Sequence, residues 1–298
     1  MQLTEHAVQV EGIRLHWSEI GPESEATPVV LLHGLNNSSR SWSYVAPLLA
    51  KDRRVLMLDL PGHGESARPN VGYALDWYAH IVALWLQSVG LERCDVIGHS
   101  FGGGVAQMLL LECPERIRRL VLVAAGGLGK EVGFWLRLAS LPLVVEHFGQ
   151  PFMALGTQLA FLSIRHSVPR ADIAQLGKFN AQSGSARAFA RTVRDVVNLR
   201  GQRRNFFKRV SEVKQLPAVL VVWGDRDKLI PIEQGRAFST MLQGSVFKAF
   251  EGAGHYLHNE QPEAFARVVR AFLDDPTVRA AHIGAPSSRD FSADIDTQ

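Results

Sequence analysis

The chain has 298 residues, 46% hydrophobic and 20% charged, so it can bury a core without disulfides or a structural metal. A formal charge of +3 is too small to indicate a nucleic-acid partner, and two cysteines do not make a disulfide framework. The N-terminus lacks a signal-peptide pattern, and the apolar run "LASLPLVV" is too short to span a bilayer. We expect a cytoplasmic protein without a membrane span or nucleic-acid partner, and leave a homodimer open.

The first half of the chain alternates strand-like and helix-like segments. Residues 6–21 alternate apolar and polar side chains around Glu11-Gly12, which predicts an antiparallel hairpin. "TPVVLLHG" and "RRVLMLDLPGHGES" are apolar runs typical of buried strands, with the helical spacing of "SYVAPLLAKD" between them. "LDWYAHIVALWLQSVG" predicts a helix that ends at Gly90. The strand "CDVIGHS", the helix "FGGGVAQMLLLECP" and the strand "IRRLVLVAAGG" follow.

This alternation predicts an α/β fold with a parallel, doubly wound sheet. It is interrupted by a long segment of helical pattern, after which strands resume at "LPAVLVVWGDRD" and "GSVFKAFEGAGH" and a last helix follows. Because this insertion lies between two strands of one sheet, we expect it to cover their carboxyl ends, where ligands bind in such sheets. The predicted organisation is a core of residues 1–127 and 215–275, a helical cap of residues 128–214, and a peripheral or mobile tail of residues 276–298.

Ser100 is the candidate nucleophile. The pattern Gly98-x-Ser100-x-Gly102 follows a predicted strand and opens a predicted helix. A serine in such a sharp turn exposes its hydroxyl, and the free amides of the helix N-terminus favour a developing negative charge. A serine that only caps the helix is the alternative interpretation.

A serine hydroxyl needs a base, and the base needs an orienting carboxylate. The last predicted strand ends at His255, and the strand before it ends at Asp225 and Asp227. The chain order of serine, aspartate and histidine is the order found in hydrolases with this type of turn.

The motifs "HGLN", "DLPGHGES", "GHSFGG", "WGDRD" and "GAGHYLHNEQP" resemble those of the α/β-hydrolase superfamily from about Val10 to Asp275. The resemblance implies a mostly parallel, eight-stranded sheet with an inserted helical cap. It implies Ser100 as nucleophile, His255 as general base and Asp227 as the carboxylate of the "WG-x-x-D" pattern, with Asp225 as competitor.

Two backbone N–H groups are expected to hold the oxyanion of the reaction, those of Leu35 and Phe101. Asn36 either adds an amide contact to substrate or serves a turn. His99 is expected to point away from the hydroxyl as a packing or hydrogen-bonded residue, His33 to fix the oxyanion loop, and His63 to stabilise a glycine turn. His258 could support the site from behind. No zinc pattern or nucleotide-binding motif is present, so we expect no metal and no cofactor.

Specificity is expected to come from the cap. Its large apolar side chains should mostly form the cap core, while some face the nucleophile. They are Phe134, Trp135, Leu138, Leu141, Leu143, Val144, Phe148, Phe152 and Met153. Phe134, Trp135 and Asn36 are the candidate substrate-binding residues. Arg187, Arg191 and Arg194 share one helical face that is either solvated or attracts an anion, and only Asp195 offsets their charge locally.

The sequence therefore predicts a serine hydrolase that cleaves an ester of a fairly hydrophobic carboxylic acid through an acyl-enzyme on Ser100. Similar proteins also cleave carbon–carbon bonds of ring-fission products, open lactones, hydrolyse amides or transfer acyl groups with the same triad. Carbon–carbon cleavage is the first alternative. Haloalkane dehalogenase and epoxide hydrolase activities are disfavoured because those relatives carry aspartate at the nucleophile position. A ligand receptor built on the same fold is the alternative outside catalysis.

Overall fold

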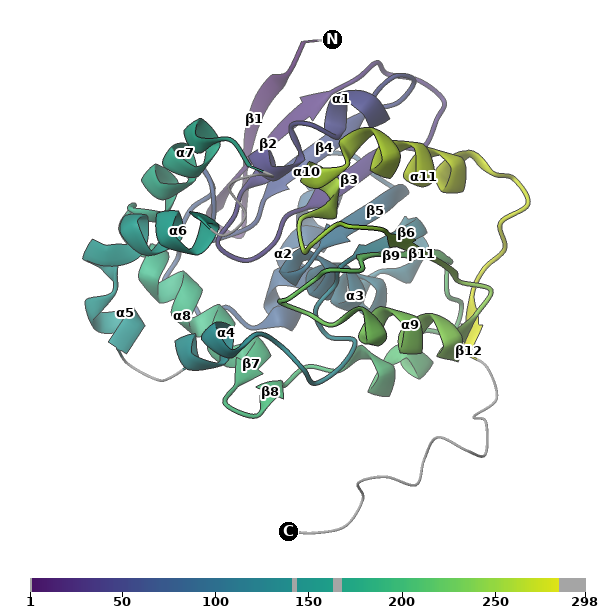
Figure 1. Ribbon diagram of the computed structural model, residues 1–298. Coiled ribbons are helices and arrows are strands. Elements are labelled where there is room, and N and C mark those ends of the chain that lie inside the picture. The colour runs from purple at the N-terminus through teal and green to yellow at the C-terminus, as the bar shows by residue number, and fades with distance from the viewer. Residues whose placement is uncertain (1, 141–143, 163–167, 284–298) are drawn as a thin grey trace.

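The computed structural model describes residues 2–140, 144–162 and 168–283, and its centre is one eight-stranded sheet (Figure 1). The strand order is β1-β2-β4-β3-β5-β6-β9-β11. The strands are β1 (Thr4–Val10), β2 (Ile13–Ile20), β3 (Val29–Leu32), β4 (Val55–Asp59), β5 (Cys94–His99), β6 (Ile117–Val123), β9 (Ala218–Gly224) and β11 (Val246–Phe250). β2 pairs antiparallel with β1 and β4, and every other pairing in this sheet is parallel. The prediction of a mostly parallel eight-stranded sheet is confirmed.

The central strands are mainly apolar and are buried along their whole length, because helices cover both of their faces. Every residue of β3, β4, β5 and β9 is buried. Strands buried on both sides need no polar alternation, which explains runs such as "VVLL" and "AVLVVWG". The β1–β2 hairpin turns at Glu11 and Gly12, which both have positive φ.

Helices of the core cover both faces of the sheet. The core helices are α1 (Ala46–Leu49), α2 (Leu75–Ser88), α3 (Phe101–Glu112), α9 (Ile232–Met241), α10 (Leu257–Glu260) and α11 (Pro262–Asp274). α2 packs against α3, and α1 packs against α11. In Figure 1 these two pairs lie on opposite sides of the central strands.

The segment between β6 and β9 forms a group of helices beside the sheet, drawn in teal in Figure 1. They are α4 (Phe134–Ala139), α5 (Val144–Phe148), α6 (Met153–Leu162), α7 (Arg170–Asn180) and α8 (Ser185–Val196), followed by the short strands β7 (Val197–Asn198) and β8 (Gly201–Gln202). A small apolar cluster holds α6 and α7 together, made of Phe161, Val168, Ile173 and Leu176. We call this segment the cap, and its boundaries at residues 128 and 214 stay a prediction.

The large apolar side chains of the cap are mostly at its surface, so the prediction that they form a cap core is wrong for most of them. Trp135 is 78% exposed and Phe148 72%, and Phe134, Leu138 and Phe152 are exposed as well. Met153 is buried, whereas Leu141, Leu143 and the side chain of Val144 lie outside the described residues. The physical reason is that α4 and α5 are single short helices. Each can press only one face onto the molecule, which leaves the other in solvent.

The arginine face of α8 is paired, which corrects the expectation that only Asp195 offsets it. Glu146 of α5 accepts hydrogen bonds from Arg191 (2.7 Å) and from Arg194. The guanidinium of Arg187 donates to the carbonyl of Arg68 in the core (3.0 Å). These arginines therefore join α8 to α5 and to the core.

From Pro276 the described chain continues to β12 (His282–Ile283), which pairs antiparallel with β10 (Leu242–Gln243). The rest of the predicted tail, residues 284–298, lies outside the described residues. Within the described ranges, no helix is long and apolar enough to cross a membrane.

The two cysteines are free and buried. Cys94 begins β5 and Cys113 follows α3. Burial raises the pKa of both thiols, that of Cys113 to about 12.

Candidate active site

The turn from β5 into α3 holds Ser100 in a strained conformation. Its φ of 52° and ψ of −115° are angles that residues other than glycine rarely adopt. The backbone N–H of Ser100 donates to the carbonyl of Val123 (2.9 Å), which ties the turn to the neighbouring strand β6. The buried strand before Ser100 and the buried helix after it hold the turn in this strained geometry, as is common at functional sites.

Glycines beside Ser100 are required by close backbone approach. A Cβ at Gly98 would lie 2.4 Å from the carbonyl oxygen of Gly102, and one at Gly102 would lie 2.3 Å from that of Leu32. Neither contact involves a flexible side chain that could move aside. The pattern Gly98-x-Ser100-x-Gly102 is therefore a steric requirement of this turn.

Three side chains from three strand ends meet in a hydrogen-bonded chain. The hydroxyl of Ser100 lies 2.9 Å from Nε2 of His255, and Nδ1 of His255 lies 2.7 Å from Oδ2 of Asp227. The other oxygen of Asp227 accepts the backbone N–H groups of Leu229 (2.8 Å) and Ile230 (3.0 Å). Because the carboxylate can only accept, Nδ1 of His255 carries the proton and Nε2 accepts from Ser100. This arrangement can activate a serine for attack on a carbonyl carbon.

Asp225, the competing carboxylate, serves a loop. Its Oδ1 accepts the backbone N–H of Gly252 at 2.8 Å, which joins the end of β9 to the turn after β11. The structure thus brings Asp227, and not Asp225, to His255.

The peptide unit between Ser100 and Phe101 is oriented by its carbonyl group. That carbonyl accepts the N–H groups of Gly126 (3.0 Å), Gly103 (3.0 Å) and Gly104 (3.2 Å). In a planar trans peptide the C=O and N–H bonds point in opposite directions. The N–H of Phe101 is therefore directed away from these three donors.

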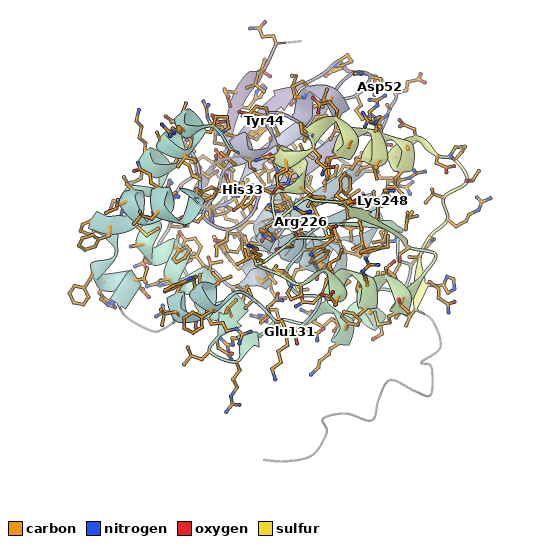
Figure 2. All side chains as sticks on the ribbon, in the orientation of Figure 1. His33, Tyr44, Asp52, Glu131, Arg226 and Lys248 are labelled. Carbon is orange, nitrogen blue, oxygen red and sulfur yellow. The ribbon has the colours of Figure 1, made fainter. Side chains whose placement is uncertain are left out.

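The peptide unit between Gly34 and Leu35 is held in the same way. The carbonyl of Gly34 accepts from Nδ1 of His33 (2.8 Å) and from the N–H of Asn37 (3.3 Å), which turns the N–H of Leu35 to the opposite side. Nε2 of His33 in turn accepts the N–H of Leu60 (3.0 Å), so its tautomer is defined. Figure 2 labels His33 near the middle of the molecule.

The residues that carry these two amides lie at the same pocket. Leu35 and Phe101 line one pocket with Ser100. Neither N–H donates to another group within the part of the chain that the structure describes. Two unused donors beside a serine hydroxyl can stabilise the negative oxygen of a tetrahedral intermediate.

His99, the histidine next to Ser100, holds the backbone of His255. Its ring is fully buried, and its Nε2 donates to the carbonyl of His255 at 2.9 Å. His258 packs behind it, between the rings of His99 (4.5 Å between centroids) and Trp42 (4.4 Å). Neither ring nitrogen of His258 has a hydrogen-bond partner among the described residues. Burial lowers the pKa of both histidines, that of His258 to about 3, so both are neutral.

His63 is a third neutral histidine near the site. Its Nδ1 lies 3.0 Å from the carbonyl oxygen of Pro61, within the turn after β4, and its ring stacks on Phe101. Burial lowers its pKa to about 3. Burial also lowers the pKa of His33, so the histidine that holds the peptide unit before Leu35 and the histidine that packs on Phe101 are both uncharged.

The pocket beside Ser100 is small and mainly apolar. Its free volume is about 60 Å³, far below the roughly 300–1,000 Å³ of ordinary small-molecule sites. Its apolar lining includes Leu35, Leu75, Val132, Leu136, Val197 and Ile230. Leu136 belongs to α4, so the cap supplies part of the wall.

The three residues expected to bind substrate, Asn36, Phe134 and Trp135, are not among those that line this pocket, and their role stays a prediction. Phe134 and Trp135 do not line the pocket, although their neighbour Leu136 does. Successive residues of a helix are about 100° apart, which allows Leu136 to face the pocket while its neighbour Trp135 lies in solvent. The side-chain amide of Asn36 donates to Thr157 of α6 (3.0 Å).

Sequence reasoning missed Leu136 and Thr157. Leu136 carries no signal that separates it from the other apolar residues of α4. Thr157 is a polar residue inside the apolar stretch "MALGTQLAFL", which is a signal for a buried hydrogen bond but does not identify the partner.

Comparison with known proteins gives one consistent family. A sequence profile of the α/β hydrolase fold matches residues 27–262. An uncharacterized protein of Mycobacterium tuberculosis is 33% identical, over 83% of this chain and 75% of that protein. A 2-hydroxy-6-oxo-2,4-heptadienoate hydrolase of Pseudomonas putida is 27% identical, over 88% of this chain and 93% of that protein.

A solved structure shows the same fold. The enol-lactonase of Burkholderia xenovorans superposes with a TM-score of 0.75 at 21% identity. The superposition covers 91% of this chain and 100% of the enol-lactonase chain.

Proposed function

Because the chain belongs to the α/β-hydrolase fold family, we propose that it hydrolyses esters of short, hydrophobic carboxylic acids through an acyl-enzyme on Ser100. The observation that carries this proposal is the hydrogen-bonded chain from Ser100 through His255 to Asp227. The apolar pocket beside it suits a hydrocarbon acyl group, and its small volume favours a short one.

Acylation begins when the hydroxyl of Ser100 attacks the ester carbonyl carbon and its proton moves to Nε2 of His255. The N–H groups of Leu35 and Phe101 donate to the oxygen that becomes negative. Collapse of the tetrahedral intermediate breaks the bond to the alcohol oxygen, which takes the proton from His255. Asp227 stabilises the imidazolium while it exists.

Deacylation repeats these steps with water. His255 removes a proton from the water molecule as it attacks the acyl carbon of Ser100. The second tetrahedral intermediate releases the carboxylic acid, and His255 returns the proton to Oγ of Ser100. The overall reaction consumes one ester and one water and yields one acid and one alcohol.

Carbon–carbon bond hydrolysis is the second candidate. It is favoured by the 27% identity with the 2-hydroxy-6-oxo-2,4-heptadienoate hydrolase of Pseudomonas putida, which extends over 93% of that protein. The same serine would attack a ketone carbonyl, and collapse of the tetrahedral intermediate would break the adjacent carbon–carbon bond. The leaving carbanion, stabilised by conjugation, would take the proton from His255, and water would then hydrolyse the acyl group on Ser100.

The test compares the purified chain with Ser100→Ala on p-nitrophenyl acetate, butyrate and octanoate, and on a vinylogous 1,5-diketone acid. We expect the short esters to be hydrolysed and Ser100→Ala to lose on the order of 10⁵-fold or more in kcat, because triad members act as a unit. Phenylmethylsulfonyl fluoride should add one sulfonyl group to Ser100, located by mass spectrometry.

Ser88→Ala is the matched control, since the hydroxyl of Ser88 only donates to the carbonyl of Trp85 at the end of α2. It should keep full activity. Ester hydrolysis that survives Ser100→Ala would overturn the nucleophile. Faster turnover of the diketone than of every ester would select the second candidate, and binding without turnover would favour a ligand receptor.

A further inference from the structure

A buried polar cluster connects the cap to the loop that carries Leu35. It consists of Asn36 in that loop, Thr157 in α6 and Asn180 at the end of α7. Thr157 is 1% exposed and Asn180 2%. Buried polar side chains are costly unless their hydrogen bonds are made, so this cluster defines one arrangement of the two segments.

The hydrogen bonds of the cluster converge on Thr157 and on the carbonyl of Asn36. The hydroxyl oxygen of Thr157 accepts from the amide nitrogens of Asn36 and Asn180, each at 3.0 Å. The same amide nitrogen of Asn180 also donates to the backbone carbonyl of Asn36 (3.1 Å). Thr157 thus uses both of its acceptor positions, and Asn180 both of its N–H bonds.

Asn36 follows Leu35 directly and is held by the cap through both its side chain and its carbonyl. Its φ of 58° lies in the left-handed region, which asparagine tolerates better than most residues. The peptide unit before Leu35 is held by the core, through His33 and Asn37. The proposed oxyanion donor of Leu35 therefore lies between one attachment to the core and one to the cap.

Other contacts hold the cap to the core without reaching this loop. The guanidinium of Arg68, in the core, donates to the hydroxyl of Ser185 (2.7 Å) at the start of α8. The hydroxyl of Tyr44 donates to Asp172 of α7 (2.9 Å). These contacts provide a control, because they fasten the same cap at other places.

We infer that Thr157 and Asn180 are positioning residues, which set the N–H of Leu35 for the oxyanion through Asn36. The inference rests on the proposed function. It means that the oxyanion site is complete only while α6 and α7 are seated against the core. The cap then contributes to the chemical step as well as to the pocket wall.

The test is Thr157→Val, which keeps the shape of the side chain but removes the acceptor of two N–H groups. With p-nitrophenyl butyrate, we expect kcat to fall about tenfold to a hundredfold, less than the roughly 10²–10³-fold loss of an oxyanion donor itself. KM should change less than about threefold, because the acyl pocket is untouched. Thr157→Ser restores the acceptor and should return kcat to within about twofold of the unmodified chain.

Binding of a trifluoromethyl ketone adds an independent measurement. This inhibitor forms a tetrahedral anion on the nucleophile, so its affinity depends on the oxyanion donors. Thr157→Val should weaken it by the same factor as kcat/KM. Ser185→Ala, which loosens the cap elsewhere, should leave both values within about twofold. Asn180→Ala breaks the same cluster from α7 and replaces Thr157→Val if that variant does not fold.

The outcomes separate the two claims. If the unmodified chain shows no turnover that depends on Ser100, the proposed function fails and this inference with it. If that turnover is present and both cluster variants keep kcat and inhibitor affinity, only the inference is overturned. Equal losses in Ser185→Ala and Thr157→Val would also overturn it, since a merely loosened cap would then explain both.

Discussion

The sheet edge and the cap meet at one pocket, but the side chains of the sheet edge are held by many more contacts than those of the cap. At the sheet edge, Asp227 accepts three hydrogen bonds, and the backbone of Ser100 is held at a positive φ by the turn between β5 and α3. On the cap, α4 directs Leu136 inward and leaves Trp135 in solvent. The difference shows that groups proposed for chemistry need several simultaneous restraints, whereas a pocket wall needs only one inward face per helix. Substitutions in the two regions should therefore differ in kind.

The largest difference is expected between two carboxylates of the sheet edge. Asp227→Asn should lower kcat by about 10⁴-fold, because an amide donor facing Nδ1 favours the wrong tautomer of His255. Asp225→Asn keeps an oxygen for the N–H of Gly252 and should change kcat by less than about threefold. Steady-state kinetics on one ester measure both. A larger loss in Asp225→Asn would assign the carboxylate role to Asp225.

The acid sensitivity of the fold should also come from the sheet side. His33, His63, His99 and His258 have lowered pKa values because they are buried. Below about pH 6.5 the unfolded chain binds protons that the folded chain does not, so stability present at neutral pH is lost as the pH falls toward the lower pKa values of the folded chain, which are about 3 for His63 and His258. Each such histidine contributes up to about 1.4 kcal/mol of lost stability per pH unit in this window.

His258→Phe tests this on the residue whose ring nitrogens have no partner among the described residues. When the pH falls from 7.5 to 5.5, the free energy of unfolding of the variant should rise by about 1.4 kcal/mol relative to that of the unmodified chain, because the variant no longer carries a buried neutral histidine that binds a proton on unfolding. Urea titrations at the two pH values provide the comparison. An identical difference at both pH values would show that His258 does not couple folding to protons.

The smallest effect is expected on the outer face of the cap. Trp135→Ser should change the free energy of unfolding by less than about 0.5 kcal/mol and leave kcat/KM for p-nitrophenyl butyrate within about twofold, because the side chain is mostly in solvent. Leu136→Ser, one residue further along α4, is the matched variant and should reduce both. A greater loss from Trp135→Ser would mean that the two faces of α4 have been assigned the wrong way round.

Much of the fold could be predicted because each central strand is a local apolar run with its own end signals. The continuous stretches of β3, β4 and β9 identify parallel strands buried on both faces without any tertiary information. Ser100, Asp227 and His255 were found because their motifs lie at strand ends, which a parallel sheet brings to one edge. Their catalytic roles stay a proposal.

The cap could not be predicted to the same depth, because its contacts join residues that are far apart in the chain. Asn36 and Thr157 are 121 positions apart, and Asn36 and Asn180 are 144 apart. Glu146 pairs with arginines more than forty positions later, at separations of 45 and 48 residues. Nor does local hydrophobicity show which face of a short helix meets the core, because Trp135 and Leu136 are both large, mainly apolar side chains.

The two buried thiols give the chain a practical property. Cys94 and Cys113 are its only cysteines, and their raised pKa values leave little of the reactive thiolate at neutral pH. A cysteine introduced at an exposed cap position, such as Phe148→Cys, would then be the preferred target of a maleimide dye. Fluorescence from that dye would follow the cap in solution while both native thiols stayed unlabelled.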